Sequence, residues 1–215
     1  VGTCVAAMKA AVSIPVTVKC RIGVDEQDPE TALDELADAV FATGADALWV
    51  HARKAWLEGL SPKENRDSPP LDYDRVYRLK ARWPDHFIGI NGGIRTIAEA
   101  REHLAHADGV MFGRAAYHEP GMLAGVDELL GQRPTEPVDF AEIIETMANY
   151  AVRHVERGGR LAHVTRHMTG LFHGMPGARR YRQILSTDAT RLGAGAEVLR
   201  AAFAAVGLAS AEAAA

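Results

Sequence analysis

The chain of 215 residues has only two cysteines, no long apolar run and no strong net charge. Cys4 and Cys20 form no metal-binding spacing, which argues against a disulfide-stabilised secreted domain and favours a reducing, cytoplasmic setting. No apolar run approaches the roughly 18 residues of a membrane span, so we expect no membrane partner. The formal net charge of -4 excludes a chain that is basic throughout; we expect no DNA partner, and any polyanion site must be local.

The composition is that of an ordinary globular protein, and its patterns alternate between strand and helix. Strand patterns cover residues 14–20, 46–51, 87–90 and 108–112, and helical patterns cover residues 5–12, 29–43, 72–83 and 96–106. The first helix should carry Val5, Met8 and Val12 on one face. Gly44 ends the second helix, and Thr96 with Glu99 predicts a capping box. This alternation predicts parallel strands joined by crossover helices.

The part after residue 131 has a different pattern. Residues 138–215 contain no strand signal, and helical periodicity recurs over residues 140–155 and 194–206. A linker rich in polar residues, proline and glycine, 131–137, precedes them. We therefore expect an α/β domain over residues 1–131 and a separate all-helical domain over residues 138–215.

Polar and glycine residues stand where the four predicted strands end. They are Lys19, His51, Asn91, Gly92, Gly93, Gly113 and Arg114. The glycines allow backbone N–H groups to approach an anion, and the helix that follows adds its positive end. A phosphate site after strands 7 and 8 recurs in the TIM (β/α)8 barrel. The sequence thus predicts the C-terminal half of such a barrel, strands 5–8, with strands 1–4 expected before Val1.

Two neighbouring residues of the first strand should point in opposite directions. Lys19 should lie at the barrel mouth with an anionic partner, because burying a lone ammonium is costly; a reduced flavin is one candidate. Cys20 should turn to the other face and pack under a helix rather than act as a nucleophile.

Cations gather in two places. The loop over residues 51–66 carries Arg53, Lys54, Lys63 and Arg66 around Trp56, which is either a solvated surface loop or a binding loop for a phosphate-rich ligand with exposed bases. Residues 151–191 hold eight arginines against two acidic residues, a net charge of 8 − 2 = +6. Such a surface is expected for RNA or another polyanion, unless the arginines pair within the domain.

Six segments resemble the bacterial tRNA-dihydrouridine synthases of the A-type subfamily, in order and over nearly the whole chain. They are VKCRIG (18–23), HARKAWL (51–57), GLSPKENR (59–66), INGG (90–93), DGVM (108–111) with the Gly113-Arg114 pair, and GMPGAR (174–179). The resemblance implies an FMN enzyme that uses NADPH to reduce a uridine of the tRNA D-loop, at position 20 or 20a, to 5,6-dihydrouridine. It also implies a flavin barrel followed by a helical tRNA-binding domain.

The resemblance assigns roles to particular residues. The strand-end residues, Lys19, His51, Asn91, Gly92, Gly93, Gly113 and Arg114, would bind FMN. Lys63, Arg66, Arg179 and Arg182 would contact tRNA. The family's catalytic acid is a cysteine in a Cys-Pro-Ser loop after strand 4, and these 215 residues do not contain that motif. We therefore expect the catalytic cysteine upstream of Val1, and no tRNA reduction by this chain alone.

Two other functions stay open at this stage. One is a flavin- or phosphate-binding barrel oxidoreductase that acts on a small molecule, as a dihydroorotate dehydrogenase does; the basic helical domain argues against it. The other is a non-catalytic RNA-binding fragment. No metal site and no protein partner are expected, and the protein should be a monomer.

Overall fold

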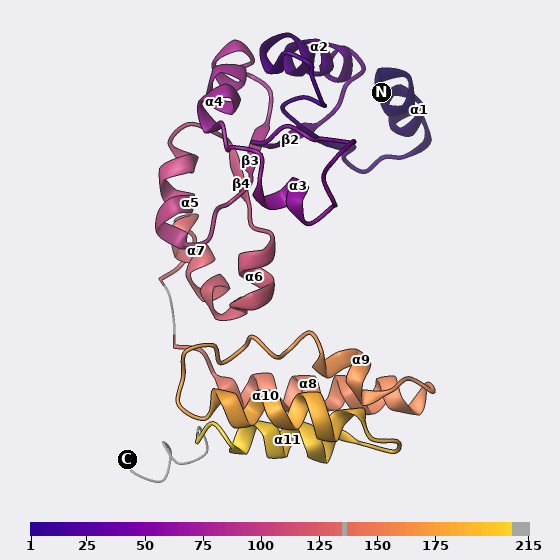
Figure 1. Cartoon of the computed structure of the whole chain (residues 1–215), viewed down its shortest axis with the longest axis vertical. Coiled ribbons are helices and arrows are strands. Elements are labelled where there is room, and N and C mark those ends of the chain that lie inside the picture. The colour runs from indigo at the N-terminus through magenta and orange to yellow at the C-terminus, as the bar shows by residue number, and fades with distance from the viewer. Residues whose placement is uncertain (135–136, 208–215) are drawn as a thin grey trace. The chain divides into compact units, whose positions relative to one another are not determined.

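The computed structural model describes residues 1–134 and 137–207; residues 135 and 136 of the expected linker, and residues 208–215, lie outside the described part. Two compact units make up the chain, Val1–Gly113 and Arg114–Ala215 (Figure 1). The sequence placed residues 114–131 with the first domain. In the structure these residues belong to the second unit, and Tyr117 in this segment contacts His167 through its hydroxyl group at 3.0 Å.

The first unit is an α/β structure around a four-stranded parallel sheet, as predicted. The strands lie in the order β1-β2-β3-β4, each beside the next in sequence. Its elements are α1 (Gly2–Ala11), β1 (Thr17–Arg21), α2 (Pro29–Phe41), β2 (Ala47–His51), α3 (Glu64–Asp67), α4 (Tyr73–Arg82), β3 (Ile88–Asn91), α5 (Ile97–Leu104) and β4 (Gly109–Met111).

The two faces of this sheet differ in chemistry. One face is apolar; its central residues Leu48, Val50 and Ile90 are completely buried. Figure 1 shows α2, α4 and α5 along one side of the sheet, and we call this apolar side the helix-covered face. The opposite side, which we call the exposed face, carries polar and aromatic residues in register: Lys19 beside Trp49, and Arg21 beside His51. In a parallel sheet the crossover helices cover a face of the sheet and bury its apolar side chains.

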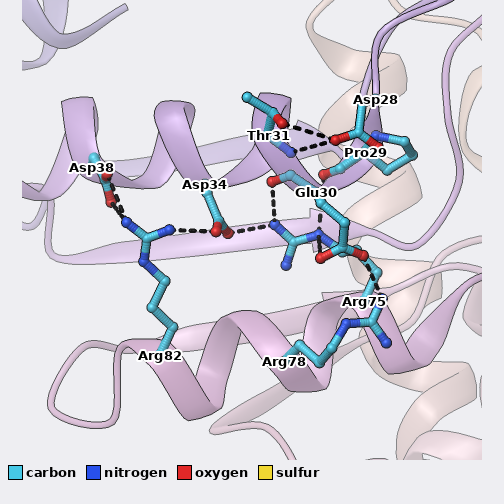
Figure 2. A network of polar contacts seen from close by, with 9 residues as sticks. All are labelled: Asp28, Pro29, Glu30, Thr31, Asp34, Asp38, Arg75, Arg78 and Arg82. Carbon is cyan, nitrogen blue, oxygen red and sulfur yellow. Dashed lines mark hydrogen bonds and ion pairs between the residues drawn. The ribbon is translucent and has the colours of Figure 1, made fainter.

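An ion-pair network joins α2 to α4 (Figure 2). Arg75 is only 1% exposed, and its guanidinium donates to the carbonyl oxygens of Pro29 and Glu30 at 3.0 and 2.9 Å. It also reaches Asp34 at 2.5 Å, and Asp34 binds Arg82 on its other side. The buried cation thus has two carbonyl oxygens and a carboxylate as partners, and such pairing is the condition under which a protein tolerates a buried charge.

Two local predictions are confirmed, and the apolar face of the first helix is only partly buried. Gly44 has a φ of 82°, and Thr96 with Glu99 forms the capping box. Of the apolar face expected on the first helix, only Val5 is buried; Met8 and Val12 are 52% and 45% exposed, and Val12 lies beyond the end of α1. The helix α1 meets α2 near Gly2, where an added Cβ would lie 2.7 Å from the Ala39 carbonyl oxygen.

The described part of the second unit is helical. Its elements are α6 (Arg114–His118), η1 (Pro120–Gly125), α7 (Val126–Leu129), α8 (Phe140–Glu156), α9 (Leu161–Thr165), α10 (Ala178–Thr187), η2 (Asp188–Thr190) and α11 (Ala196–Ala204). Three buried aromatic rings, Phe172, Tyr181 and Phe203, pack edge to face with centroids 4.8 to 5.6 Å apart. The Tyr181 hydroxyl donates to the Met168 carbonyl oxygen at 3.0 Å, so its burial leaves no polar atom unsatisfied.

Candidate functional site

The carboxyl ends of the parallel strands bring two predicted residues, His51 and Asn91, into one row. Arg21, His51, Asn91 and Met111 are register partners across β1 to β4. Side chains in one row of a parallel sheet project from the same face, so Arg21, His51 and Asn91 project together on the exposed face. Arg21 was not among the residues predicted from the sequence. The sequence did contain an indication of its position, because Arg21 lies two residues after Lys19 and strand alternation places both on the same face.

Lys19 lies one row deeper than predicted, beside Trp49. It is exposed in this unit, and no carboxylate in the described residues forms an ion pair with it. Partial burial lowers the pKa of its ammonium group, and the neighbouring Arg21 lowers it further, although the Cys20 thiol opposes both. The anionic partner predicted for Lys19 is not found among the described residues, and an anion bound there would raise the pKa of the ammonium group again.

A left-handed turn follows β3. Gly92 and Gly93 have φ values of 120° and 72°, a conformation that favours glycine. A Cβ on Gly92 would lie 3.4 Å from the His51 ring, and one on Gly93 would lie 2.7 Å from Leu71. The turn is thus closely packed on one side, and His51 and Gly92 are brought into contact distance. The Asn91 side chain donates to the Met111 carbonyl oxygen at 2.8 Å, which ties β3 to β4.

The second glycine turn follows β4. Gly113 lies two residues beyond this strand, and a Cβ added there would meet no atom within 4 Å. Arg114 is the next residue and begins α6. Gly113 belongs to the first unit and Arg114 to the second. The backbone at Gly113 therefore has space on its Cα side for a ligand group.

The loop after β2 is folded around one asparagine that the sequence reading missed. Asn65 accepts from the Trp56 N–H at 2.7 Å and donates to the Trp56 carbonyl oxygen at 2.6 Å. The Arg21 guanidinium donates to the carbonyl oxygens of Lys54 and Asn65, both at 2.8 Å. The loop and the first strand are therefore bonded together, although they are far apart in sequence.

The predicted cations of this loop lie at its surface. Lys63 and Arg66 are both exposed. Lys63 precedes the short helix α3 as its N-cap, and Arg66 lies within the helix. The Lys54 ammonium lies 5.2 Å from the centre of the Trp56 ring, within the range of a cation–π contact. Burial lowers the pKa of Arg21, and the nearby Arg53 and Arg66 lower it further. The mutual influence of these guanidinium groups shows that positive charge is concentrated here.

The two cysteines lie away from the exposed face. Cys20 is the register partner of Val50, which is fully buried, so it lies on the helix-covered face as predicted. Burial raises the pKa of its thiol to about 12. Cys4 is exposed on α1. A thiol with so high a pKa is a weak nucleophile and a poor proton donor near neutral pH.

The predicted cations of the second unit lie on α10. Its buried face consists of Tyr181, Ile184 and Leu185, and Arg179 and Arg182 are exposed on the other side. Of the eight arginines over residues 151–191, only Arg191 forms an ion pair with an acidic residue within the described part of the chain. The positive charge of the other seven arginines is therefore not offset by ion pairs with carboxylates in the described part of the chain.

The described residues contain neither a metal-binding cluster nor a membrane-spanning helix. No group of three or more histidine, cysteine, aspartate or glutamate side chains could hold a metal ion in residues 1–134 and 137–207. Within the same ranges, no helix has both the length and the apolar character needed to cross a membrane.

Comparison with known proteins identifies the family. The family model described as dihydrouridine synthase (Dus) matches residues 1–206. The chain belongs to the dihydrouridine synthase family. This confirms the resemblance inferred from the six sequence segments.

Named relatives in this family come from several bacteria. The tRNA-dihydrouridine(20/20a) synthase of Shewanella oneidensis is 54% identical over 203 residues, which cover 94% of this chain and 61% of that protein. The proteins of the same name from Salmonella typhimurium and Escherichia coli K12 are each 50% identical, over 204 and 205 residues, or 61% and 59% of their lengths. The chain thus spans about three fifths of the length of the family members that it matches.

Proposed function

We propose that the protein carrying this chain reduces a uridine at position 20 or 20a of the tRNA D-loop to 5,6-dihydrouridine, with FMN as cofactor and NADPH as reductant. The observation that carries the proposal is the 50–54% identity, over 94% of the chain, to proteins named tRNA-dihydrouridine(20/20a) synthase. Identity at this level extends through both units, so it includes the basic helical unit as well as the sheet.

The sheet is proposed to be strands 5–8 of a TIM (β/α)8 barrel, followed by the helical tRNA-binding unit. Two features support this. The four strands are parallel and lie in sequence order, and the sheet has one buried apolar face. In a barrel the other face points inward, and ligands bind at the carboxyl ends of the strands. The row of Arg21, His51 and Asn91 lies at this end.

The exposed face suits an FMN molecule. The Gly92-Gly93 turn offers backbone N–H groups to a phosphate, Gly113 has open space beside it, and Arg114 adds a guanidinium that can bind two phosphate oxygens. Lys19 is a cation with no carboxylate partner in the described residues, as needed beside a reduced flavin that carries negative charge. His51 and Asn91 would contact the same ligand. Bound FMN supplies the hydride that reduces the uracil ring.

The tRNA is proposed to bind through both units. Lys63 and Arg66 would contact phosphates from the loop after β2, and Arg179 and Arg182 would do so from α10. The exposed position of these side chains, and the scarcity of acidic partners for the arginines of residues 151–191, support this role. A small substrate would need no such surface, which disfavours a dihydroorotate dehydrogenase-like reaction.

Neither cysteine of the chain is proposed as the proton donor to the uracil ring. Cys20 lies on the helix-covered face with a pKa of about 12, and Cys4 lies on α1. A general acid must reach the atom that it protonates, and neither residue lies in the row at the strand ends.

The test exchanges matched segments between relatives. In the Shewanella oneidensis relative, the 203 matched residues are replaced by those of this chain, and we call this protein the exchange chimera. It is supplied with FMN, NADPH and tRNA that lacks modifications, and dihydrouridine is mapped along the tRNA. We expect dihydrouridine at position 20 or 20a at a rate within about tenfold of the relative. A folded chimera that binds tRNA but forms no dihydrouridine, or forms it elsewhere, would contradict the proposal.

A further inference from the structure

One hydroxyl group fixes the orientation of the glycine turn after β3. Tyr73, at the start of α4, donates its hydroxyl to the Gly92 carbonyl oxygen at 2.7 Å. The same hydroxyl lies 3.0 Å from the point where a Cβ of Gly93 would be, so it contacts both glycines. No other hydrogen bond to this carbonyl occurs among the described residues.

The geometry of the peptide bond turns this contact into a directional one. The peptide that joins Gly92 to Gly93 contains the Gly92 carbonyl and the Gly93 N–H, and these two groups point in opposite directions in a trans peptide. Holding the carbonyl against Tyr73 therefore directs the Gly93 N–H away from α4. Glycine has the least restricted backbone of all residues, so this hydrogen bond adds a restraint that the two glycines do not supply themselves.

Tyr73 is itself held in place. Its ring meets the His103 ring edge to face, with centroids 4.4 Å apart. His103 is 7% exposed, and its Nδ1 lies 2.7 Å from the Tyr77 hydroxyl. Tyr73, His103 and Tyr77 thus form a packed group between α4 and α5. The contact with His103 holds the Tyr73 ring in place.

We propose that Tyr73 is a positioning residue that orients the Gly93 N–H toward the phosphate of the flavin. The inference rests on the proposed function, because the ligand at the turn is the FMN of that proposal. Tyr73 acts through the backbone and does not need to touch the flavin. Its loss should therefore weaken FMN binding while the remainder of the site stays intact.

The chain offers a matched control for this role. Tyr73 and Tyr77 lie one turn apart on α4, and each makes one hydrogen bond with its hydroxyl. Tyr73→Phe removes the bond to the turn, whereas Tyr77→Phe removes the bond to His103. Both substitutions keep the ring, so a general loss of packing should affect the two variants alike.

The first measurement is the FMN affinity of the exchange chimera, followed by quenching of flavin fluorescence. We expect Tyr73→Phe to raise the dissociation constant about 5- to 10-fold, the factor expected for one hydrogen bond, and Tyr77→Phe to change it less than about twofold. Equal effects of the two variants, or no effect of Tyr73→Phe, would overturn the proposal.

The second measurement needs no cofactor. The backbone order parameter of the Gly93 N–H is measured by NMR relaxation in this chain, unaltered and carrying each substitution, and should fall only in Tyr73→Phe. If the unaltered chimera binds no FMN, the cofactor assignment fails, and this comparison still decides whether Tyr73 orders the turn. An unchanged Gly93 order parameter in Tyr73→Phe would reject the positioning role even if the enzyme reduces tRNA.

Discussion

Replacing Arg75 with alanine should destabilise the first unit severely, because the guanidinium is buried and holds α2 against α4. The substitution removes two hydrogen bonds to the carbonyl oxygens of Pro29 and Glu30 and the ion pair with Asp34. It leaves these acceptors beside a cavity. Breaking a buried ion pair by removing one partner costs about 3–5 kcal/mol.

The structure places Arg75→Ala at the lower end of that range. Asp34 is 29% exposed and keeps Arg82 as a second partner, so it is not left as an isolated buried charge. We therefore expect a loss of about 3 kcal/mol in the free energy of unfolding. Since small domains have a stability of only about 5–15 kcal/mol, this is a large fraction of the total.

The matched control is Arg78→Ala, one turn from Arg75 on α4. Arg78 binds Glu30 at 2.5 Å, but the two side chains are 54% and 53% exposed. Exposed pairs contribute about 0–1 kcal/mol, so this variant should be nearly as stable as the unaltered protein.

The assay is urea unfolding followed by tryptophan fluorescence. All three tryptophans, Trp49, Trp56 and Trp83, lie in the first unit, so the signal reports on that unit and not on the helical one. The midpoint should fall strongly in Arg75→Ala while the slope stays constant. A loss below about 1 kcal/mol, or one equal to that of Arg78→Ala, would refute the reasoning about the buried cation.

Three further predictions concern the binding site. In the exchange chimera, Arg114→Ala should weaken FMN binding by about 1.5–3 kcal/mol, the scale of a charge-assisted hydrogen bond, as measured by flavin fluorescence. The salt dependence of tRNA binding is the slope of log affinity against log salt concentration, measured by gel-shift titration. Lys63→Ala and Arg182→Ala should each reduce the magnitude of this slope by roughly 0.7–0.9. Iodoacetamide at pH 8 should label the exposed Cys4 well before Cys20, because burial raises the pKa of the Cys20 thiol to about 12 and leaves little thiolate.

Each of these predictions has an outcome that contradicts it. Unchanged FMN affinity in Arg114→Ala would remove this residue from the phosphate site. Arg200 serves as the control for the tRNA titrations, because it is an exposed arginine of the second unit that pairs with Glu145 at 2.9 Å. If Arg200→Ala lowers the slope as much as Arg182→Ala does, the titration reports general charge rather than contacts. Rapid labelling of Cys20 in the folded protein would show that it is not covered.

The elements that the sequence predicted correctly depend on local chemistry. Thr96 and Glu99 form the capping box, and Gly44 takes the left-handed conformation, because each feature involves residues within a few positions of one another. The opposite directions of Lys19 and Cys20 follow from strand alternation alone. Strand-end positions indicated the candidate phosphate-site residues, and the resemblance then assigned them to FMN and named the tRNA contacts.

The features that the sequence did not predict depend on distant partners. Arg75 looks like a surface residue of a helix, and only the acidic side of α2 makes its burial possible. Asn65 looks like one more polar loop residue, yet it closes a turn around Trp56. Tyr73 acts on Gly92, which lies 19 positions later in the chain. Neither periodicity nor local propensity contains such pairings.

The large indole ring of Trp49 restricts which residues can occupy the neighbouring strands. It lies across the exposed face so closely that a Cβ on Gly89 would be 2.2 Å from its ring, and one on Gly109 would be 2.9 Å from it. Alanine at Gly89 is therefore acceptable only together with a smaller residue at position 49. Alanine at Gly109 also requires a smaller residue at position 87, because the Phe87 ring would lie 2.8 Å from the added Cβ. We expect these four positions to vary jointly among homologues. Recombination between family members should accordingly exchange β2, β3 and β4 as one block.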